Sequence, residues 1–126
     1  MHEILSLAET QNDVVLQTES LTARYDETTR TLWNYLHASP RPCFTEALLA
    51  DAHQLHTMIR NGEIPVDFYV AASEVPKVFN LGGDLSLFRR CALEQDWERL
   101  THYAERCIEV LHDLVCGFGQ QVISIA

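Results

Sequence analysis

Two adjacent glycines between an apolar segment and a helical pattern constrain the fold of this chain more than any other feature. Residues 68–73, Phe-Tyr-Val-Ala-Ala-Ser, are rich in β-forming side chains and predict a strand. Residues 78–88, Val-Phe-Asn-Leu-Gly-Gly-Asp-Leu-Ser-Leu-Phe, follow and end in a helical pattern. Gly82 and Gly83 permit backbone conformations that other residues avoid and let a ligand approach closely. The sequence therefore predicts a tight strand-to-helix turn, with Asp84 as the helix N-cap.

Such a turn has a chemical consequence. Main-chain N–H groups at the start of a helix lack partners within the helix, and they attract negative charge. This arrangement is half of an oxyanion hole. The alternative is an ordinary turn with an Asp cap and no ligand, because turns in general favour Asn, Gly and Asp.

Residues 79–85 resemble the first oxyanion loop of the crotonase (enoyl-CoA hydratase/isomerase) superfamily. That loop reads Phe, two variable residues, Gly, a small residue, Asp and Leu, and this chain has Phe-Asn-Leu-Gly-Gly-Asp-Leu. In the family the amide of the small residue binds the oxygen of an acyl thioester. The resemblance thus implies that Gly83 is a backbone oxyanion donor. It also implies a substrate-binding set in which Gly82 permits the turn, Asp84 fixes the helix start, and four apolar side chains line or support the pocket: Phe79, Leu81, Leu87 and Phe88.

A narrower resemblance rests on three segments taken together: residues 41–45 (Arg-Pro-Cys-Phe-Thr), 78–88, and 103–107 (Tyr-Ala-Glu-Arg-Cys). They are similar to the synthases of diffusible signal factors, which make cis-2-unsaturated fatty acids for quorum sensing. These enzymes act on acyl-carrier-protein thioesters as dehydratases and thioesterases. The resemblance implies an acyl-CoA or acyl-ACP substrate, no metal and no separate cofactor. It further implies homo-trimers or hexamers, and a sensor kinase as a partner.

The rest of the chain predicts an α/β fold that is crotonase-like (ClpP/crotonase, ββα type). Residues 17–25 and 31–36 alternate around a polar turn and predict a hairpin. Thr45 is a candidate N-cap for a helix that ends near Gly62. The strand at 68–73 would then lie parallel to the hairpin strand that precedes this helix.

The second half of the chain continues the same α/β pattern. Apolar residues recur every three or four positions from Trp97 to Phe118, which predicts a long amphipathic helix capped by Asp96. Residues 121–126 predict a final strand. The expected order is hairpin, helix, strand, glycine loop, helices, strand. Residues 1–15 lack periodicity and predict an irregular arm, so residues 16–126 would form the N-terminal portion of a crotonase-like domain.

The resemblance covers only the first half of a crotonase domain. In the family, the strand matching residues 122–126 leads into a second glycine-rich loop with the other oxyanion donor, and the acid-base glutamates lie on it and beyond it. Losing one donor costs about 10²–10³ in rate, and without a glutamate no group moves the proton. We expect a hydratase-like lyase or thioesterase as the full-length parent, and no turnover from this stretch alone. The alternative is a truncated, non-catalytic binding or assembly module that pairs through a sheet edge.

Composition excludes several classes of function. Nine basic and 18 acidic residues give a net charge of −9, which disfavours nucleic acid and anionic membranes as partners. No apolar run reaches the length of a membrane span, and the N-terminus lacks the pattern of a signal peptide, so we expect a cytoplasmic protein. The four cysteines form no Cys-x-x-Cys pair and are expected to be reduced. Local positive charge for CoA or a carrier could come from Arg41, Lys77, Arg89 and Arg90.

The remaining polar clusters favour structural interpretations. His53 and His56 lie one helical turn apart, but zinc needs further protein ligands and no companion is evident. We interpret both as part of a solvated or half-buried helix face. Four acids of the long helical region predict a solvated face rather than a catalytic pair: Glu94, Glu98, Glu105 and Glu109. No metal site is expected.

Overall fold

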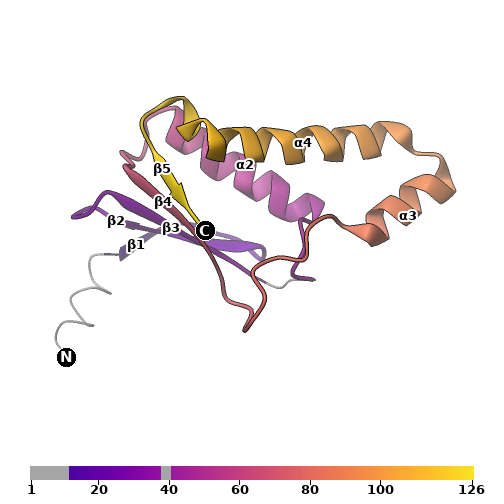
Figure 1. Cartoon of the computed structure of the whole chain (residues 1–126), viewed down its shortest axis with the longest axis horizontal. Helices are drawn as coiled ribbons and strands as arrows, with labels where there is room; N and C mark the ends of the chain where they lie inside the picture. Colours follow the sequence, from indigo (N-terminus) through magenta and orange to yellow (C-terminus); the bar gives the residue numbers. More distant parts are fainter. Residues whose placement is uncertain (1–11, 38–40) are drawn as a thin grey trace.

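Three consecutive strands form an antiparallel meander at one side of the sheet (Figure 1). They are β1 (Asn12–Gln17), β2 (Leu21–Asp26) and β3 (Thr31–Leu36). β2 and β3 are the predicted hairpin, with Leu21 opposite Leu36 and Asp26 opposite Thr31. Successive side chains of β3 point to opposite faces of the sheet: Leu32, Asn34 and Leu36 are buried, while Trp33 and Tyr35 between them are half-buried. The computed structural model describes residues 12–37 and 41–126.

The prediction for the first residues was partly wrong. Residues 12–15 were expected in an irregular arm, but they belong to β1, which pairs antiparallel with β2. The hairpin strand also begins at Leu21 rather than at residue 17. Thr18 explains this start, because its hydroxyl accepts from the amides of Ser20 at 3.0 Å and Leu21 at 3.1 Å, which closes a tight turn. Residues 1–11 of the predicted arm lie outside the described residues.

The other half of the sheet is parallel, as the crossover pattern predicted. Helix α2 (Glu46–Arg60) connects β3 to β4 (Phe68–Ser73), and β5 (Ile123–Ile125) pairs with the outer side of β4. The strand order is β1-β2-β3-β4-β5. The chain therefore has an α/β fold with a mixed five-stranded sheet, and the described ranges contain three α-helices.

Side-chain caps fix where the helices begin. The Thr45 hydroxyl accepts from Leu48 N at 3.1 Å and starts α2. The Asp84 carboxylate starts α3 (Leu85–Glu94), and the Asp96 carboxylate starts α4 (Trp97–Val115). All three caps were predicted. A short 3₁₀ turn, η1 (Gly117–Gly119), then leads to β5.

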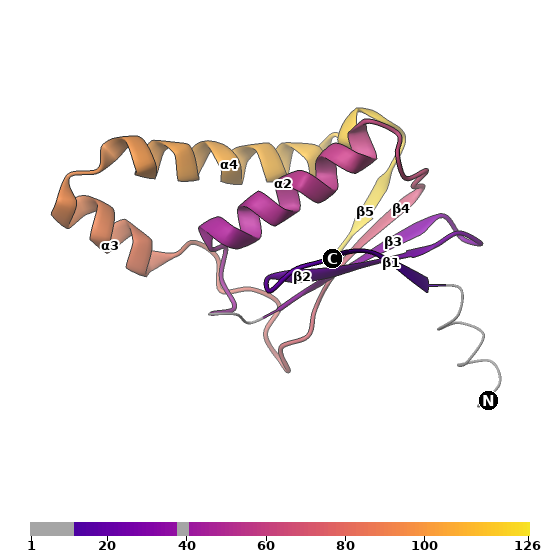
Figure 2. The same cartoon turned by 180° about the vertical axis from the view of Figure 1, so that it is seen from behind.

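Helices α2 and α4 lie side by side on one face of the sheet, and α3 lies beyond its end (Figures 1 and 2). This arrangement produces two apolar clusters. The sheet cluster joins α2 and the sheet, and its most buried members are Leu21, Ala23, Leu32, Leu55, Ile59, Tyr69 and Phe118. The helix cluster joins α2, α3 and α4, and consists of Leu49, Ala52, Leu87, Cys91, Tyr103 and Val110. Within the described ranges no helix has the length and apolarity needed to cross a membrane.

Helix α4 is less covered than its apolar stripe predicted. Leu100, Cys107 and Leu114 are half-buried, but Trp97 and Leu111 remain 57% and 61% exposed. Figure 1 gives the reason, because α4 runs past the end of α2 towards α3 and has no second layer above it. The side chains that α4 buries most deeply are Tyr103, Val110 and Asp113.

Candidate functional site

The glycine loop adopts the predicted turn at the start of α3. Gly82 has φ +90°, a conformation that L side chains rarely adopt, and its N–H donates to Asn80 Oδ1 at 2.7 Å. The Asp84 carboxylate accepts from Leu87 N at 3.3 Å. Gly83 N–H, between these two, meets no acceptor among the residues that the structure describes. The loop therefore presents one unengaged amide directly before a helix N-terminus.

The glycine loop is held by the segment that precedes α2. Leu81 N donates to Pro42 O at 2.7 Å, and Phe44 N donates to Gly82 O at 2.8 Å. Arg41 adds an ion pair to Asp84 at 2.9 Å. These bonds engage the atoms on both sides of Gly83 and fix the backbone there.

Tyr103 of α4 completes the support of the loop. Its hydroxyl accepts from Asp84 N at 3.1 Å and donates to Phe44 O at 2.6 Å. Burial raises the pKa of Tyr103 to about 12, so the hydroxyl keeps its proton and its donor role at neutral pH. Residues 41–45, 78–88 and 103–107, which are far apart in sequence, thus meet at one place. Tyr103 belongs to one of the three segments that carry the resemblance, but nothing in the sequence predicted its hydrogen bonds to the loop.

An apolar hollow of about 370 Å³ lies beside Gly83. It is formed by the loop, α2 and α4, and it is lined by Phe44, Leu49, Gly82, Gly83, Cys107, Val110, Leu111 and Leu114. None of these side chains is charged, and burial raises the pKa of the Cys107 thiol. The hollow suits an aliphatic group, and Gly83, whose N–H meets no acceptor in the described residues, belongs to its lining.

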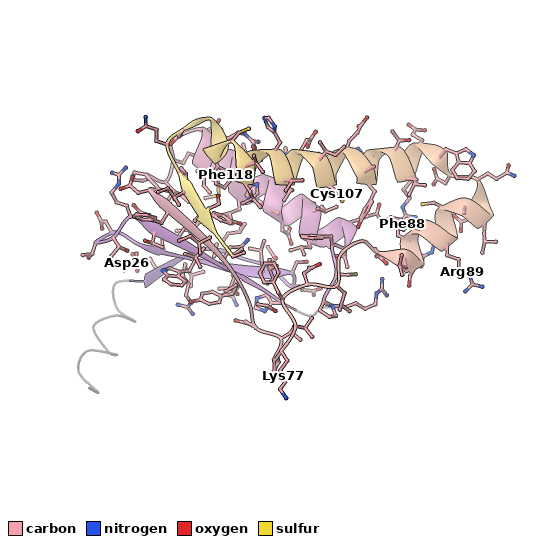
Figure 3. The ribbon with its side chains drawn as sticks, viewed as in Figure 1. Asp26, Lys77, Phe88, Arg89, Cys107 and Phe118 are labelled. Carbon is pink, nitrogen blue, oxygen red and sulfur yellow. The ribbon has the colours of Figure 1, made fainter. Side chains whose placement is uncertain are left out.

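A side chain at position 83 would meet the ring of Phe88. A Cβ there would lie 2.9 Å from the Cζ of Phe88, whose ring packs edge-to-face on Tyr103 at a centroid distance of 5.4 Å. Figure 3 shows Phe88 in the space between α3 and α4. A larger residue at position 83 would therefore require the Phe88 ring to move away from Tyr103.

The other predicted substrate-binding residues divide into three groups. Leu87 is buried in the helix cluster and Phe88 packs against it, so both support the loop from behind. Phe79 lines a second cavity, described below, and is 46% exposed. Leu81 is 70% exposed and lines neither cavity.

The predicted basic patch does not assemble around the loop. Arg41 lies at the loop through its pair with Asp84. Lys77 lies at the tip of the connection after β4, whereas Arg89 lies on the outer side of α3, and Figure 3 shows them well apart. Positive charge at the glycine loop therefore comes from Arg41, and the guanidinium of this residue is half exposed.

A second cavity of about 240 Å³ lies between the helices and the parallel strands, and Phe44, Val110 and Leu114 line both spaces. One wall carries a buried polar chain. Asn34 Nδ2 donates to Tyr69 Oη at 2.7 Å, and Tyr69 Oη lies 3.3 Å from His56 Nε2. His56 Nδ1 lies 3.1 Å from Asp113 Oδ2.

The interpretation of His56 as solvated or half-buried was wrong. Its side chain is 1% exposed and packs edge-to-face on Tyr69 and Phe118. Burial, opposed by the bond to Asp113, lowers the pKa of His56 from 6.5 to about 4, so the imidazole is neutral at pH 7. The sequence did hold a signal, because His56 follows Ala52 by four positions and precedes Ile59 by three, on the buried stripe of α2.

Other candidate groups lie apart from both cavities. Glu94, Glu98, Glu105 and Glu109 are exposed, as predicted. In the described part of the chain, no three His, Cys, Asp or Glu side chains come together as metal ligands. Cys43 and Cys91 are buried free thiols, while Cys116 is exposed.

Comparison with known proteins adds no assignment. No protein-family model matches the chain, and no curated protein is significantly similar to it. Membership of the crotonase superfamily therefore stays a prediction from the residues quoted above.

Proposed function

We propose that this chain is the thioester-binding part of a crotonase-type enzyme, and that Gly83 N–H donates to the carbonyl oxygen of an acyl-CoA or acyl-ACP thioester. The single observation that carries the proposal is the unengaged Gly83 amide at the edge of an apolar hollow. We also propose that the α/β fold of this chain is of the ClpP/crotonase type. Residues 41–45, 78–88 and 103–107 meet at the glycine loop, and this supports the proposal.

The local electrostatics favour an oxygen that gains negative charge. Gly83 immediately precedes the Asp84 cap of α3, where the amides of the first helical turn add a positive potential. The side chains that line the hollow are apolar and offer no competing donor, which favours a hydrogen bond from the backbone amide to an oxyanion. The acyl chain would bury its methylenes against Phe44, Val110 and Leu114.

This chain supplies binding and polarisation rather than a full reaction. A thioester enolate needs a second converging donor and a group that moves a proton at the α or β carbon. The hollow at Gly83 is lined by carbon, two glycines and one thiol, with no carboxylate or imidazole. A hydratase, dehydratase or thioesterase reaction would take those groups from elsewhere in the complete enzyme, so the 126-residue chain binds without turnover.

Two ligands that differ at the carbonyl test the proposal. Octanoyl-CoA carries the thioester, whereas S-octyl-CoA has the same length of chain and lacks the carbonyl oxygen. We expect the chain to bind octanoyl-CoA roughly three- to tenfold more tightly by isothermal titration calorimetry, the effect of one hydrogen bond. The amide resonance of Gly83 should move downfield with octanoyl-CoA only. Equal affinities together with an unmoved Gly83 resonance would contradict the proposal.

A pair of variants isolates the amide proton. Gly83→Pro and Gly83→Ala both introduce a Cβ that meets Phe88, but only the proline lacks the N–H. We expect Gly83→Pro to bind both ligands equally and Gly83→Ala to keep part of the preference. Circular dichroism of each variant establishes that it is folded. If neither variant folds, the shift of the Gly83 amide resonance in the wild-type chain still tests whether this N–H binds the carbonyl oxygen.

The proposal extends to assembly and partners. A homo-trimer or hexamer would cover part of the apolar face of α4, where Trp97, Ile108, Leu111 and Val115 are exposed. The carrier of the acyl group, CoA or a carrier protein, would approach from the side of Arg41. A sensor kinase remains a proposed partner through the resemblance alone.

A further inference from the structure

Helix α4 carries a stripe of exposed residues along its outer side. Six residues form this stripe: Trp97, Thr101, Ala104, Ile108, Leu111 and Val115. The four large apolar members are each more than half exposed, and none of the six belongs to either apolar cluster. They follow one another at steps of four, three, four, three and four. This is the spacing of the a and d positions of a coiled coil, along which two helices pack side by side.

The two flanks of the stripe differ in polarity. The flank next to the helix cluster is half-buried and apolar, and consists of Leu100, Cys107 and Leu114. The opposite flank is exposed and polar, and consists of Glu98, Glu105 and His112. In heptad terms these are the g and e positions, which set the orientation of two paired helices.

The flanks favour one orientation of a second copy of α4. In a parallel pair, each polar flank would lie against the apolar flank of the other copy, and carboxylates would lose water without gaining a partner. In an antiparallel pair, the apolar flanks meet each other and the polar flanks meet each other. With Trp97 opposite Val115, Glu98 of one copy lies near His112 of the other. The helix dipoles also oppose each other favourably in this orientation.

We propose that two copies of this chain associate through α4, packed antiparallel along the stripe, with the two-fold axis between Ala104 and Ile108. The stripe is about 27 Å long, nearly the whole helix, at 1.5 Å per residue. The net charge of −9 disfavours an anionic membrane as the alternative occupant. A hexamer of two trimers would contain such a two-fold contact, whereas a trimer alone would not. The contact does not depend on the proposed thioester function, since Leu111 is the one member of the stripe that lines the hollow at Gly83.

Sedimentation equilibrium of the 126-residue chain tests the contact. We expect the mass to rise towards twice 14.4 kDa with concentration. Ile108→Lys places a charge beside the axis in both copies and should raise the Kd of the dimer at least about 100-fold. Val14→Lys is the control, because Val14 is exposed on β1 and should leave the Kd unchanged. A monomeric or trimeric wild-type chain, or a dimer that both variants or neither variant weakens, would overturn the proposal.

The distance between two spin labels tests the orientation. Cys116 is an exposed thiol at the end of α4, while Cys43 and Cys91 are buried, and Cys107→Ala removes the fourth thiol. In the antiparallel pair, Cys116 of one copy lies level with Asp96 of the other. Nitroxides on the two Cys116 residues should therefore be about 30 Å apart by pulsed electron paramagnetic resonance. A separation of about 10 Å, the distance between parallel neighbouring helices, would overturn the antiparallel orientation.

A charge substitution tests the position of the axis. Antiparallel packing brings Glu105 of both copies close to the axis, where the two carboxylates repel each other. Glu105→Gln should therefore lower the Kd of the dimer about threefold. Glu94→Gln makes the same change at an exposed residue of α3 and should leave the Kd unchanged. An unaltered or higher Kd in Glu105→Gln would contradict this alignment.

Discussion

Two buried tyrosines, one in each apolar cluster, use their hydroxyl groups in different ways. Tyr103 belongs to the helix cluster, and its hydroxyl connects two backbone atoms, Asp84 N and Phe44 O. Tyr69 belongs to the sheet cluster, and its hydroxyl connects two side chains, Asn34 and His56. Both phenols are held by hydrogen bonds on either side, and burial raises the pKa of both.

The difference lies in where each set of bonds ends. Around Tyr103, the donor and acceptor are main-chain groups of a loop, so the bonds fix backbone and leave Gly83 N–H as the free atom. Around Tyr69, the bonds continue through His56 to Asp113 and end at Asn34 Oδ1. The first arrangement leaves a backbone donor unpaired in an exposed loop, and the second leaves a side-chain acceptor unpaired inside the protein.

The largest effect is expected at the charged end of the Tyr69 chain. Asp113→Ala removes the acceptor of the buried His56 Nδ1–H and the partner of Arg60. We expect the free energy of unfolding at pH 7, measured by urea denaturation, to fall by about 3 kcal/mol. Arg60 is half-buried and can turn to solvent, which keeps the loss from being greater.

Glu109→Ala is the matched control for this change. Glu109 lies one turn earlier on α4, and its carboxylate is half exposed and pairs with Arg106. The loss there should stay below about 0.5 kcal/mol, because exposed ion pairs contribute little. If the two variants lose the same stability, the buried chain contributes no more than the surface pair does.

The next effect concerns pH. The pKa of His56 is lowered from 6.5 to about 4 in the folded state, chiefly by burial. Between these values the unfolded chain holds a proton that the folded chain lacks, so stability is lost as the pH falls from about 6.5 towards 4. We expect a loss of about 1.5 kcal/mol between pH 6.5 and 5.0. Urea midpoints of the wild type and of His56→Leu measure it, and only the wild type should show this component.

A steeper decline in His56→Leu than in the wild type would contradict the assigned direction. The groups around the imidazole are Asp113 of α4, Tyr69 of β4, and His53 and Arg60 of α2 itself. Burial raises the pKa of Tyr69, so its hydroxyl keeps its proton throughout this window. Both proteins keep Asp113, so the difference between the two curves reports His56 together with its bond to Asp113.

Local patterns predicted much of this fold, and the reasons are visible in single residues. Thr45, Asp84 and Asp96 begin helices because a short polar side chain can cap the first amides, which is a local effect. The strand at 68–73 and the glycine turn after it are equally local. Gly83 could therefore be placed before a helix from sequence alone.

Contacts between distant segments could not be predicted in the same way. His56 and Asp113 are 57 positions apart, and no local pattern pairs them. Tyr103 lies at the edge of the predicted apolar stripe of α4, beside Cys107 and Leu114, and the structure covers this edge rather than the side with Trp97 and Leu111. Which face of an amphipathic helix is covered depends on what packs there, and for α4 the covered face carries Tyr103, Val110 and Asp113.

The smallest effect is expected at the other tyrosine. Tyr103→Phe keeps the ring against Phe88 and removes the hydroxyl that joins Asp84 N and Phe44 O. We expect a loss of about 1 kcal/mol in the free energy of unfolding. Hydrogen exchange should accelerate at Asp84 N–H, while the amides of β3 keep their protection. Tyr69→Phe is the control, since it removes the same atom from the sheet cluster and should leave exchange at Asp84 unchanged. Unaltered exchange at Asp84 in Tyr103→Phe would mean that the bonds from Leu81 and Phe44 hold the loop without this hydroxyl.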